Sequence, residues 1–407
     1  LAPLAYTPIV RLPVIALLLL SAVLYHFMTA YRVVIDPTMV ANAMQTDWRE
    51  TADLVSGQMV LRVLLCGLVP ALFVLALPLA RPRLLRQTLL NGLAVVVAAL
   101  VVVGTVLAGF QTFAARMRNE PALRYLLNPY NGLWGAVVVG QRVQGQLRKP
   151  IEPVGTDAQI RRRAAAAAAG APPPLIVLVV GETARSTHFG INGYARDTTP
   201  RLARWASDPG FATYTQVESC GTNTAVSLPC MFSHRGMEGS ASARGLEENL
   251  LDVLQRAGWA VLWLDNQSGC KGVCARVPSH ATRELAIPSL CGPETDGCPD
   301  EAMLHGLTER IAALDAARLR NGLVLVLHQM GSHGPAYASR SPAAHKRFLP
   351  ECRTPNLAQC DRQALVNAYD NSIVYTDVFL DSVKNWALAG AKWSSVALLY
   401  VADHGES

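Results

Sequence analysis

Three long apolar runs near the start of the chain restrict its fold more than any other feature. They cover residues 13–35, 58–80 and 88–110, and a helix of ~20 residues is long enough to cross the hydrocarbon of a bilayer. A helix buried in a water-soluble core and a cleaved signal peptide are the alternatives, but consecutive runs of this length are typical of membrane spans. The sequence therefore predicts a helical transmembrane domain over residues 1–112.

Loop charges predict the orientation of these spans. The loop between the second and third runs is basic and contains Arg81, Arg83 and Arg86. The loop between the first two runs is acidic, and its carboxylates are Asp36, Asp47, Glu50 and Asp53. Basic loops remain in the cytoplasm, so we expect the chain beyond residue 110 on the outer side of the membrane. In a bacterium this would be a multi-pass inner-membrane protein with a periplasmic domain.

Cysteine usage agrees with an exported domain. Of the nine cysteines, Cys66 lies within a predicted span and the other eight fall in the soluble part. An even number of cysteines in an exported domain predicts disulfides, and short loop closures favour pairing between neighbours. The favoured pairs are Cys220 with Cys230, Cys270 with Cys274, Cys291 with Cys298, and Cys352 with Cys360. A zinc ribbon built from the four central cysteines is the alternative, although their spacing fits zinc knuckles poorly.

The overall charge favours lipid and not nucleic acid as a partner. The formal net charge of +6 is modest for 407 residues, and much of it comes from the basic loop and from residues 161–163. Such clusters favour anionic lipid surfaces. Residues 116–130 are a polar, helix-compatible stretch that we expect to lie along the membrane surface. The arginine, alanine and proline segment at residues 161–174 is typical of a linker, so residues 113–174 are predicted to connect two domains.

Residues 175–407 show a different pattern, in which short apolar runs alternate with amphipathic segments. The apolar runs predict buried parallel strands at residues 175–180, 259–264, 323–327 and 396–401. The amphipathic segments predict helices at residues 246–257, 301–319 and 362–388. Strands that alternate with helices are typical of a layered α/β fold, which we predict for this second domain.

Side chains that can bind a metal follow each predicted strand. They are Glu182 after the first strand, Asp265, Asn266 and Gln267 after the second, residues 328–333 after the third, and Asp403 and His404 after the last. Open α/β sheets bind ligands at the carboxyl ends of their strands, so we expect these side chains to share one crevice. Carboxylates with imidazoles suit zinc or manganese, which makes Glu182, Asp403 and His404 a candidate metal site. Each alone has an ordinary explanation, as a helix cap or a hydrogen-bonded core histidine.

A hydroxyl nucleophile is expected close to this site. The candidates are Thr183, Ser186, Thr222, Thr224 and Ser227. Thr224 is favoured because it begins a predicted short helix in the loop between Cys220 and Cys230, and the positive end of a helix favours phosphate. Coordination to a metal would lower the pKa of the hydroxyl further. The alternative is that Thr224 only caps this helix.

Five motifs in this order resemble the phosphoethanolamine transferases of the alkaline phosphatase and sulfatase superfamily. They are VVGETAR from Val179, CGTNTA from Cys220, DNQSGCKGVC from Asp265, HQMGSHGP from His328 and ADHGES from Ala402. Segments that begin at Asp36 and Asn128 are similar to the membrane domain of the same family, so the resemblance covers nearly the whole chain. This family includes the lipid A modifying enzymes and the mobile colistin-resistance enzymes, which implies a role in polymyxin resistance.

The resemblance implies a three-layer α/β domain of the sulfatase type and a role for each motif residue. The zinc ligands would be Glu182, Thr224, Asp403 and His404. Thr224 would also be the nucleophile. His333 would serve the substrate phosphate or a second zinc, so that the domain binds one or two zinc ions. Gln267 and Lys271 would hold the phosphoethanolamine group, and a lysine suits phosphate as a point charge.

The implied reaction is a two-step transfer at the membrane. Thr224 would take phosphoethanolamine from phosphatidylethanolamine and hold it covalently, and lipid A or the lipopolysaccharide core would then accept it. Alternatives on the same scaffold are a sulfatase, a phosphodiesterase or a glycerol-phosphate transferase, the last of which the four cysteine pairs disfavour. An inactive, truncated membrane protein is the non-enzymatic alternative. The resemblance also implies two further spans before Leu1 and a further histidine beyond Ser407, and we expect this chain to lack both.

Overall fold

The computed structural model divides the chain into two compact units, each of which is described by itself. The units are Leu1–Met44 with Val55–Gly145, and Gln45–Leu54 with Gln146–Ser407. The structure describes residues 10–46, 51, 54–78, 83–147, 150–160, 171–237, 247–285, 287, 290–291, 298–354 and 357–406. Sequence predictions that lie outside the described residues are those on Asp47, Glu50, Asp53, Arg81 and residues 161–170.

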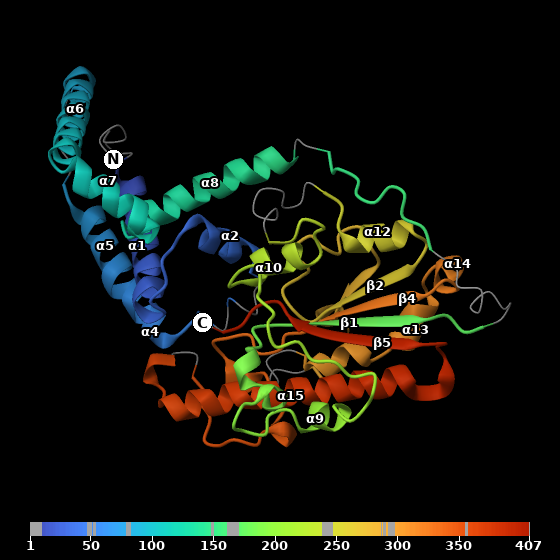
Figure 1. The fold of residues 1–407 in the computed structure, drawn as a ribbon. Coiled ribbons are helices and arrows are strands. Elements are labelled where there is room, and N and C mark those ends of the chain that lie inside the picture. The colour runs from blue at the N-terminus through green and yellow to red at the C-terminus, as the bar shows by residue number, and fades with distance from the viewer. Residues whose placement is uncertain are drawn as a thin grey trace. The chain divides into compact units, whose positions relative to one another are not determined.

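The first unit is helical (Figure 1). Its elements are α1 (Arg11–Ala30), α2 (Pro37–Gln45), α4 (Gly57–Val63), η2 (Leu64–Leu68), α5 (Val69–Ala76), α6 (Leu84–Ala108), α7 (Phe110–Asn119), η3 (Pro121–Tyr125) and α8 (Tyr130–Leu147). The stretches Arg11–Ala30, Gly57–Ala76 and Leu84–Ala108 are helices long and apolar enough to cross a membrane, as the three apolar runs predicted. The first span ends earlier than predicted, because Arg32 has a φ of 55° that a helix does not allow.

Small residues set the closest approach of helices within this unit. Gly67 of η2 faces α1, and a Cβ added to it would lie 3.1 Å from the Cβ of Ala22 and 3.2 Å from a methyl group of Leu19. Ala22 and Ala71 are almost completely buried. Small side chains allow helix backbones to pack closely in a bilayer, where van der Waals contact holds helices together. The packing of α1 against α4, η2 and α5 is therefore of the kind that membrane helices use.

The predicted surface helix at residues 116–130 is not continuous. Helix α7 ends at Asn119, η3 occupies Pro121–Tyr125, and α8 begins at Tyr130. Proline lacks a backbone N–H and restricts the residue before it, which explains the break at Glu120. Most of this helix-compatible stretch is therefore helical, in three elements.

The second unit contains a five-stranded sheet in which every pair of neighbouring strands is parallel (Figure 1). The strands are β1 (Leu175–Gly181), β2 (Ala260–Asp265), β3 (Ser279–Ala281), β4 (Leu323–His328) and β5 (Val396–Ala402), in the order β3-β2-β4-β1-β5. Four of them confirm the predicted apolar runs. Strand β3 was not predicted, because its sequence Ser-His-Ala contains no apolar run.

The register of the sheet aligns the strand ends that carry the candidate site residues. Val180 of β1 pairs with His328 of β4, and Gly181 of β1 pairs with Ala402 of β5. On the other side of β4, Asp265 pairs with His328. Residues that follow β1, β2, β4 and β5 therefore leave the sheet at the same edge, as the parallel pattern predicted.

Helices cover both faces of the sheet, which confirms the predicted three-layer sandwich (Figure 1). Helices α9 (Pro200–Trp205), α13 (Leu307–Ala312) and α15 (Arg362–Leu388) pack on the face that contains Leu325. Helices α10 (Thr224–Met231) and α12 (Leu250–Arg256) pack on the face that contains Val326. Shorter elements are η5 (Ser186–His188), η6 (Gly190–Asn192), η7 (Thr282–Glu284), η9 (Asp300–Leu304), α14 (Ala316–Leu319), η10 (Tyr337–Ser339), η11 (Ala343–His345), η12 (Leu357–Gln359) and η13 (Ala389–Ala391).

Local signals explain which helix predictions held. Helix α15 has the predicted bounds, and the Asp361 carboxylate caps it by accepting from two backbone N–H groups. Helix α12 is shorter than predicted because Asn249 and Asp252 form a capping box that begins it at Leu250. The predicted helix at residues 301–319 is instead divided into three short elements, and Gly306, with a φ of 63°, separates the first two.

Four disulfides join the soluble cysteines in sequential pairs. The bonds are Cys220–Cys230, Cys270–Cys274, Cys291–Cys298 and Cys352–Cys360. These pairs confirm the prediction from short loop closures. The zinc-ribbon alternative is wrong, because the four cysteines it requires are oxidised in pairs.

Candidate active site

Thr224 is the first residue of α10 and lies on the loop closed by the Cys220–Cys230 disulfide. Asn223 is the residue that caps this helix, because its side chain accepts a hydrogen bond of 3.0 Å from Val226 N. Thr224 is buried, and its hydroxyl donates to Glu182 Oε2 at 2.9 Å. The explanation of Thr224 as a simple helix cap is therefore wrong.

Glu182, Asp403 and His404 form the cluster that the strand ends predicted. Each offers one ligand atom, and these three atoms all lie within 4.8 Å of one another. His404 Nε2 is 3.3 Å from Glu182 Oε1 and 3.6 Å from Asp403 Oδ2. Together with the Thr224 hydroxyl, two carboxylates and an imidazole meet at the end of β1 and β5.

Thr183 holds the two carboxylates in place. Its hydroxyl donates to Glu182 Oε1 at 2.6 Å, and its backbone N–H donates to Asp403 Oδ1 at 3.2 Å. These bonds require a φ of 54°, which a β-branched residue rarely adopts. Thr183 was considered in the sequence only as a nucleophile, and its role in orienting carboxylates had no sequence signal.

Burial and the neighbouring charges shift the pKa values of all three groups in this cluster from their ordinary values. Burial raises the pKa of Asp403 to about 7, and the charge of Glu182 adds to this effect. Burial lowers the pKa of His404, but its hydrogen bond to Glu182 and the two carboxylate charges outweigh this and raise the pKa to about 9. Burial likewise opposes ionisation of Glu182, yet His404, His333 and the Thr183 hydroxyl hold its pKa well below the usual range.

The donor set of this cluster fits a metal ion. Asp403 Oδ2 is buried and has no hydrogen-bond partner among the described residues, and such an atom is costly to bury without a cation or donor. His404 Nδ1 lies 2.9 Å from Gly405 O, so that its other ring nitrogen faces the carboxylates. Carboxylate and imidazole ligands with a hydroxyl suit zinc.

His333 lies on the loop after β4, next to this cluster. Its charge influences the pKa of Glu182. Ser332 N donates to Glu182 O at 3.0 Å. A Cβ added to Gly331, whose φ is 51°, would lie 2.9 Å from the same carbonyl oxygen. The loop that presents His333 is therefore packed directly against the backbone of a predicted metal ligand.

Asp300 organises this loop and was missed in the sequence. Its buried carboxylate accepts from Met330 N at 2.8 Å, Gly331 N at 3.2 Å and Gln329 Nε2 at 3.1 Å. It also accepts from Asn266 Nδ2 at 2.8 Å, in the loop after β2. One carboxylate therefore joins the loops that follow two neighbouring strands, which no local pattern around Asp300 indicates.

Gln267 and Lys271 lie in the loop after β2, on the same edge of the sheet. Gln267 is buried, and its side-chain oxygen accepts from Ser268 N at 2.6 Å. Lys271 has a φ of 48°, and its ammonium group donates to Ser268 Oγ at 2.7 Å. The structure therefore places both at the predicted edge and joins them through Ser268, and their substrate role remains a prediction.

A buried Asp265–His328 pair lies beneath this loop. Asp265 accepts from Gln267 N at 3.0 Å and Gly269 N at 3.2 Å, so it shapes the start of the loop. His328 Nδ1 is 3.1 Å from Asp265 Oδ2, and the charge of Asp265 outweighs burial to raise the pKa of the imidazole. Both residues had been grouped with the candidate ligands, and the structure shows them paired with each other.

Comparison with known proteins identifies relatives over the whole chain. The sequence profile of the family described as phosphoethanolamine transferase EptA/EptB matches residues 1–143, and that of the sulfatase family matches residues 174–407. Phosphoethanolamine transferase EptA of Salmonella typhimurium is 37% identical over 401 residues, which is 98% of this chain and 70% of that protein. Phosphatidylethanolamine transferase Mcr-1 of Escherichia coli is 36% identical over 412 residues, which is 99% of this chain and 74% of that protein.

A solved structure resembles the fold throughout. It is the integral membrane protein lipooligosaccharide phosphoethanolamine transferase A (EptA) from Neisseria meningitidis, which matches with a TM-score of 0.88 at 33% identity. The match covers 100% of this chain and 73% of that one. The order of an apolar helical part followed by a parallel-sheet domain is therefore shared with this protein.

Proposed function

Because the chain belongs to the phosphoethanolamine transferase family, we propose that Thr224 carries phosphoethanolamine from phosphatidylethanolamine to lipid A or the lipopolysaccharide core. The observation that carries this proposal is the 2.9 Å hydrogen bond from Thr224 to Glu182. It sets a buried hydroxyl at a helix N-terminus beside a cluster that can bind a cation. Donor and acceptor are both lipids, so an enzyme held in the membrane by its apolar helices would meet both.

The proposed metal is zinc, held by Glu182, Thr224, Asp403 and His404. When bound, zinc supplies a Lewis acid that stabilises charge on the phosphoryl oxygens and favours ionisation of a hydroxyl. His333 lies next to this cluster and would contact the substrate phosphate or a second zinc. Support comes from Asp403 Oδ2, which has no hydrogen-bond partner among the described residues, and from the raised pKa values of Asp403 and His404, which a cation would reverse.

The first step is attack by Thr224 on the donor lipid. A bond forms between Thr224 Oγ1 and phosphorus, and the bond between phosphorus and the diacylglycerol oxygen breaks. The hydroxyl proton passes by way of Glu182 Oε2, the acceptor that it already faces, to the departing diacylglycerol oxygen, so that Glu182 ends the step ionised. The positive end of α10 and the Lys271 ammonium group would stabilise the negative phosphoryl oxygens.

The second step regenerates Thr224. A hydroxyl oxygen of the acceptor lipid attacks the phosphorus, the bond from phosphorus to Thr224 Oγ1 breaks, and the proton that the acceptor hydroxyl loses passes to Thr224 Oγ1. Gln267 and Lys271 would keep the phosphoethanolamine group in place between the two steps, because both leave the sheet at the same edge as the cluster. Holding the group in one position makes the second attack effectively unimolecular.

We place the sulfatase-type domain in the periplasm of a bacterium, with residues 1–112 in the inner membrane, residues 113–174 as the connection and residues 175–407 as the catalytic domain. Arg83 and Arg86 at the start of α6 favour a cytoplasmic position for that end of the helix. Four disulfides in the sheet domain favour an oxidising compartment.

The test is transfer by the purified full chain in detergent, with labelled phosphatidylethanolamine and lipid A. We expect Thr224→Ala to lower the transfer rate by several orders of magnitude, since it removes a nucleophile. Thr222→Ala is the matched control, because Thr222 lies on the same disulfide-closed loop and is exposed. Mass spectrometry of the wild-type chain with donor alone should locate phosphoethanolamine on Thr224. Transfer by Thr224→Ala at the rate of the control would overturn the assignment.

A further inference from the structure

A buried tyrosine of α15 reaches the turn that carries the candidate metal ligands. The Tyr369 hydroxyl donates to Thr183 O at 2.7 Å and accepts from Arg185 N at 2.7 Å. Tyr369 is 5% exposed, so water does not compete freely for these bonds. A single hydroxyl therefore closes both ends of the short segment 183–185 that follows Glu182.

This segment needs such support, because Thr183 is held in a left-handed conformation with a φ of 54°. A β-branched residue is strained there, and strain of this kind persists only where the surroundings enforce it. The same conformation directs Thr183 N to Asp403 Oδ1 and Thr183 Oγ1 to Glu182 Oε1. If the turn relaxed, each carboxylate would lose one of the donors that orient it.

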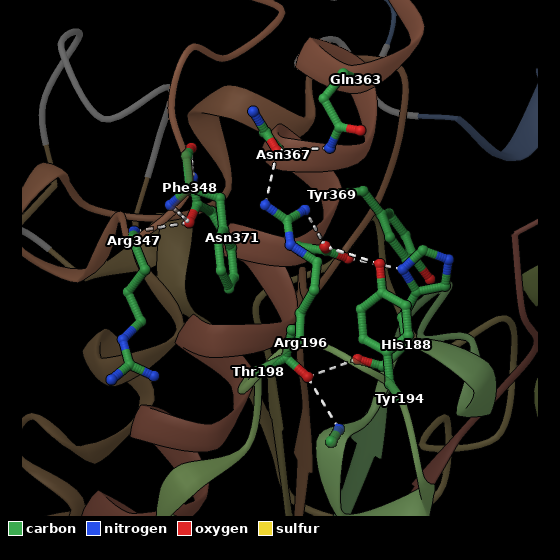
Figure 2. Close-up of polar contacts among 12 residues, drawn as sticks. His188, Tyr194, Arg196, Thr198, Arg347, Phe348, Gln363, Asn367, Tyr369 and Asn371 are labelled. Atoms are coloured by element: carbon green, nitrogen blue, oxygen red, sulfur yellow. Dashed lines mark hydrogen bonds and ion pairs between the residues drawn. The ribbon is translucent and has the colours of Figure 1, made fainter.

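The next residue of α15 fixes the chain that continues from this turn. The Asp370 carboxylate is fully buried, and its partners are His188 Nδ1 at 2.6 Å, Tyr194 Oη at 3.0 Å and Arg196 Nη1 at 2.5 Å. Figure 2 shows His188, Tyr194 and Arg196 gathered beside Tyr369. The His188 ring also packs edge-on against the Tyr369 ring, with centroids 4.9 Å apart.

Two consecutive residues of α15 therefore bind the chain that follows β1, each at a different point. Asp370 anchors the segment from His188 to Arg196, which prevents the turn from moving away from α15. Tyr369 then fixes the turn itself. Because Asp370 holds the outer segment independently, the Tyr369 hydroxyl can be removed while α15 and that segment stay docked.

We propose that Tyr369 is a positioning residue for the metal site, and that its hydroxyl holds the strained Thr183 turn so that Glu182 and Asp403 face the ion. This inference rests on the proposed function only in assuming that the cluster binds a metal. Tyr369 touches neither the substrate nor the metal in this assignment. It acts through the backbone on both sides of Thr183, as residues that orient the ligands of metal sites do.

The test compares Tyr369→Phe with Tyr375→Phe in the full chain. Tyr375 lies on the same helix, is equally buried, and donates from its hydroxyl to Glu301 Oε2 at 3.2 Å, away from the turn. Zinc affinity is measured by competition with a chromophoric chelator, and the metal-free unfolding temperature is measured in parallel. We expect the zinc Kd to rise about tenfold in Tyr369→Phe alone, at the lower end of the range for residues that support metal ligands.

Cobalt supplies a second readout that a purely structural role would not change. The absorption of bound Co²⁺ depends on ligand geometry, so it should shift in Tyr369→Phe and match wild type in Tyr375→Phe. Thr183→Gly extends the test, because glycine adopts a positive φ without strain. In that background the Tyr369→Phe change should raise the zinc Kd by a smaller factor than in the wild-type background.

The outcomes separate this inference from the proposed function. A wild-type chain that binds neither zinc nor cobalt would refute the metal assignment, and this inference with it. A wild-type chain that binds zinc, with equal Kd values for the two tyrosine variants, would refute the positioning role alone. The same refutation would follow if Tyr369→Phe raised the Kd by equal factors with and without Thr183→Gly.

Discussion

Helix α6 and strand β4 consist of the same kinds of apolar residue but bury them differently. In β4 every position is buried, and Leu325 has no exposed surface. In α6 the apolar side chains face outwards, and Leu100 and Val97 are 67% and 50% exposed. Protein covers the apolar side chains of the strand on both faces of the sheet, whereas those of the helix require a hydrocarbon solvent around them. The same composition therefore specifies a core in one unit and a membrane surface in the other.

The loss of unfolding free energy on breaking an ion pair should differ most between the two units. Asp370→Ala removes a fully buried carboxylate that is paired with Arg196 and takes the acceptor away from three partly buried side chains, so the unfolding free energy should fall by about 3–5 kcal/mol. Glu120→Ala breaks the exposed pair with Arg116 and should cost about 0.3–0.5 kcal/mol. Denaturant unfolding of the full chain in detergent measures both changes. Equal losses would mean that burial does not distinguish the units.

Truncation of a leucine should also destabilise the sheet domain more than the helical unit. Leu325→Ala creates a cavity between the layers of the sheet domain, and such changes cost about 2–5 kcal/mol. Leu100→Ala removes a side chain that contacts little protein and should change stability by less than about 0.5 kcal/mol. The unfolding temperatures of both variants in the same detergent give the comparison. A larger loss for Leu100→Ala would show that α6 has a protein partner.

A charge introduced at an exposed position should be costly in α6, where lipid is the expected solvent, and tolerated in the sheet domain. Val97→Arg places a cation in the middle of α6 and should cost about 2.5–3.5 kcal/mol of membrane insertion. Val217→Arg is the matched control, because Val217 is 64% exposed in the sheet domain, where water is the solvent. A glycosylation reporter at the end of α6 measures the inserted fraction. Equal insertion of both variants would argue against a lipid-facing α6.

The pH dependence of zinc affinity should arise in the sheet domain, and its expected free-energy change is the smallest of these predictions. Zinc binds deprotonated ligands, whereas the metal-free pKa values are about 9 for His404 and about 7 for Asp403. Zinc affinity should therefore rise with pH, by up to about tenfold per unit (about 1.4 kcal/mol) between these values, where only His404 releases a proton. Below that range both ligands must release protons, and the slope should be steeper. A zinc Kd that does not change across this range would contradict the ligand assignment.

Much of the fold was predictable because its signals are local. The three spans, four of the five strands and helix α15 follow from apolar runs and periodicity. The predicted helix at residues 301–319 was wrong because one residue, Gly306, interrupts the pattern before α13. Strand β3 has no pattern of its own and forms because Trp263 and its neighbours in β2 offer it a pairing edge.

The candidate cluster was also predictable in part, because parallel strands end at a common edge. Glu182, Asp403 and His404 each follow a strand, and the register brings them together. Their supports were not predictable. Tyr369 lies within a long helix with nothing unusual in the sequence around it, and only the docking of that helix brings its hydroxyl to the Thr183 turn.

The sequence by itself determined the type of each unit, the sequential disulfides and the edge of the sheet where chemistry collects, because these depend on residue type, spacing and strand direction. Only the tertiary structure decided that the Thr224 hydroxyl faces Glu182, that Asp300 joins two loops, and that a strained threonine links Glu182 to Asp403. Each of these depends on atoms distant in the chain coming within hydrogen-bonding distance. Such contacts exist only after the helices have packed on the sheet, so no local pattern records them.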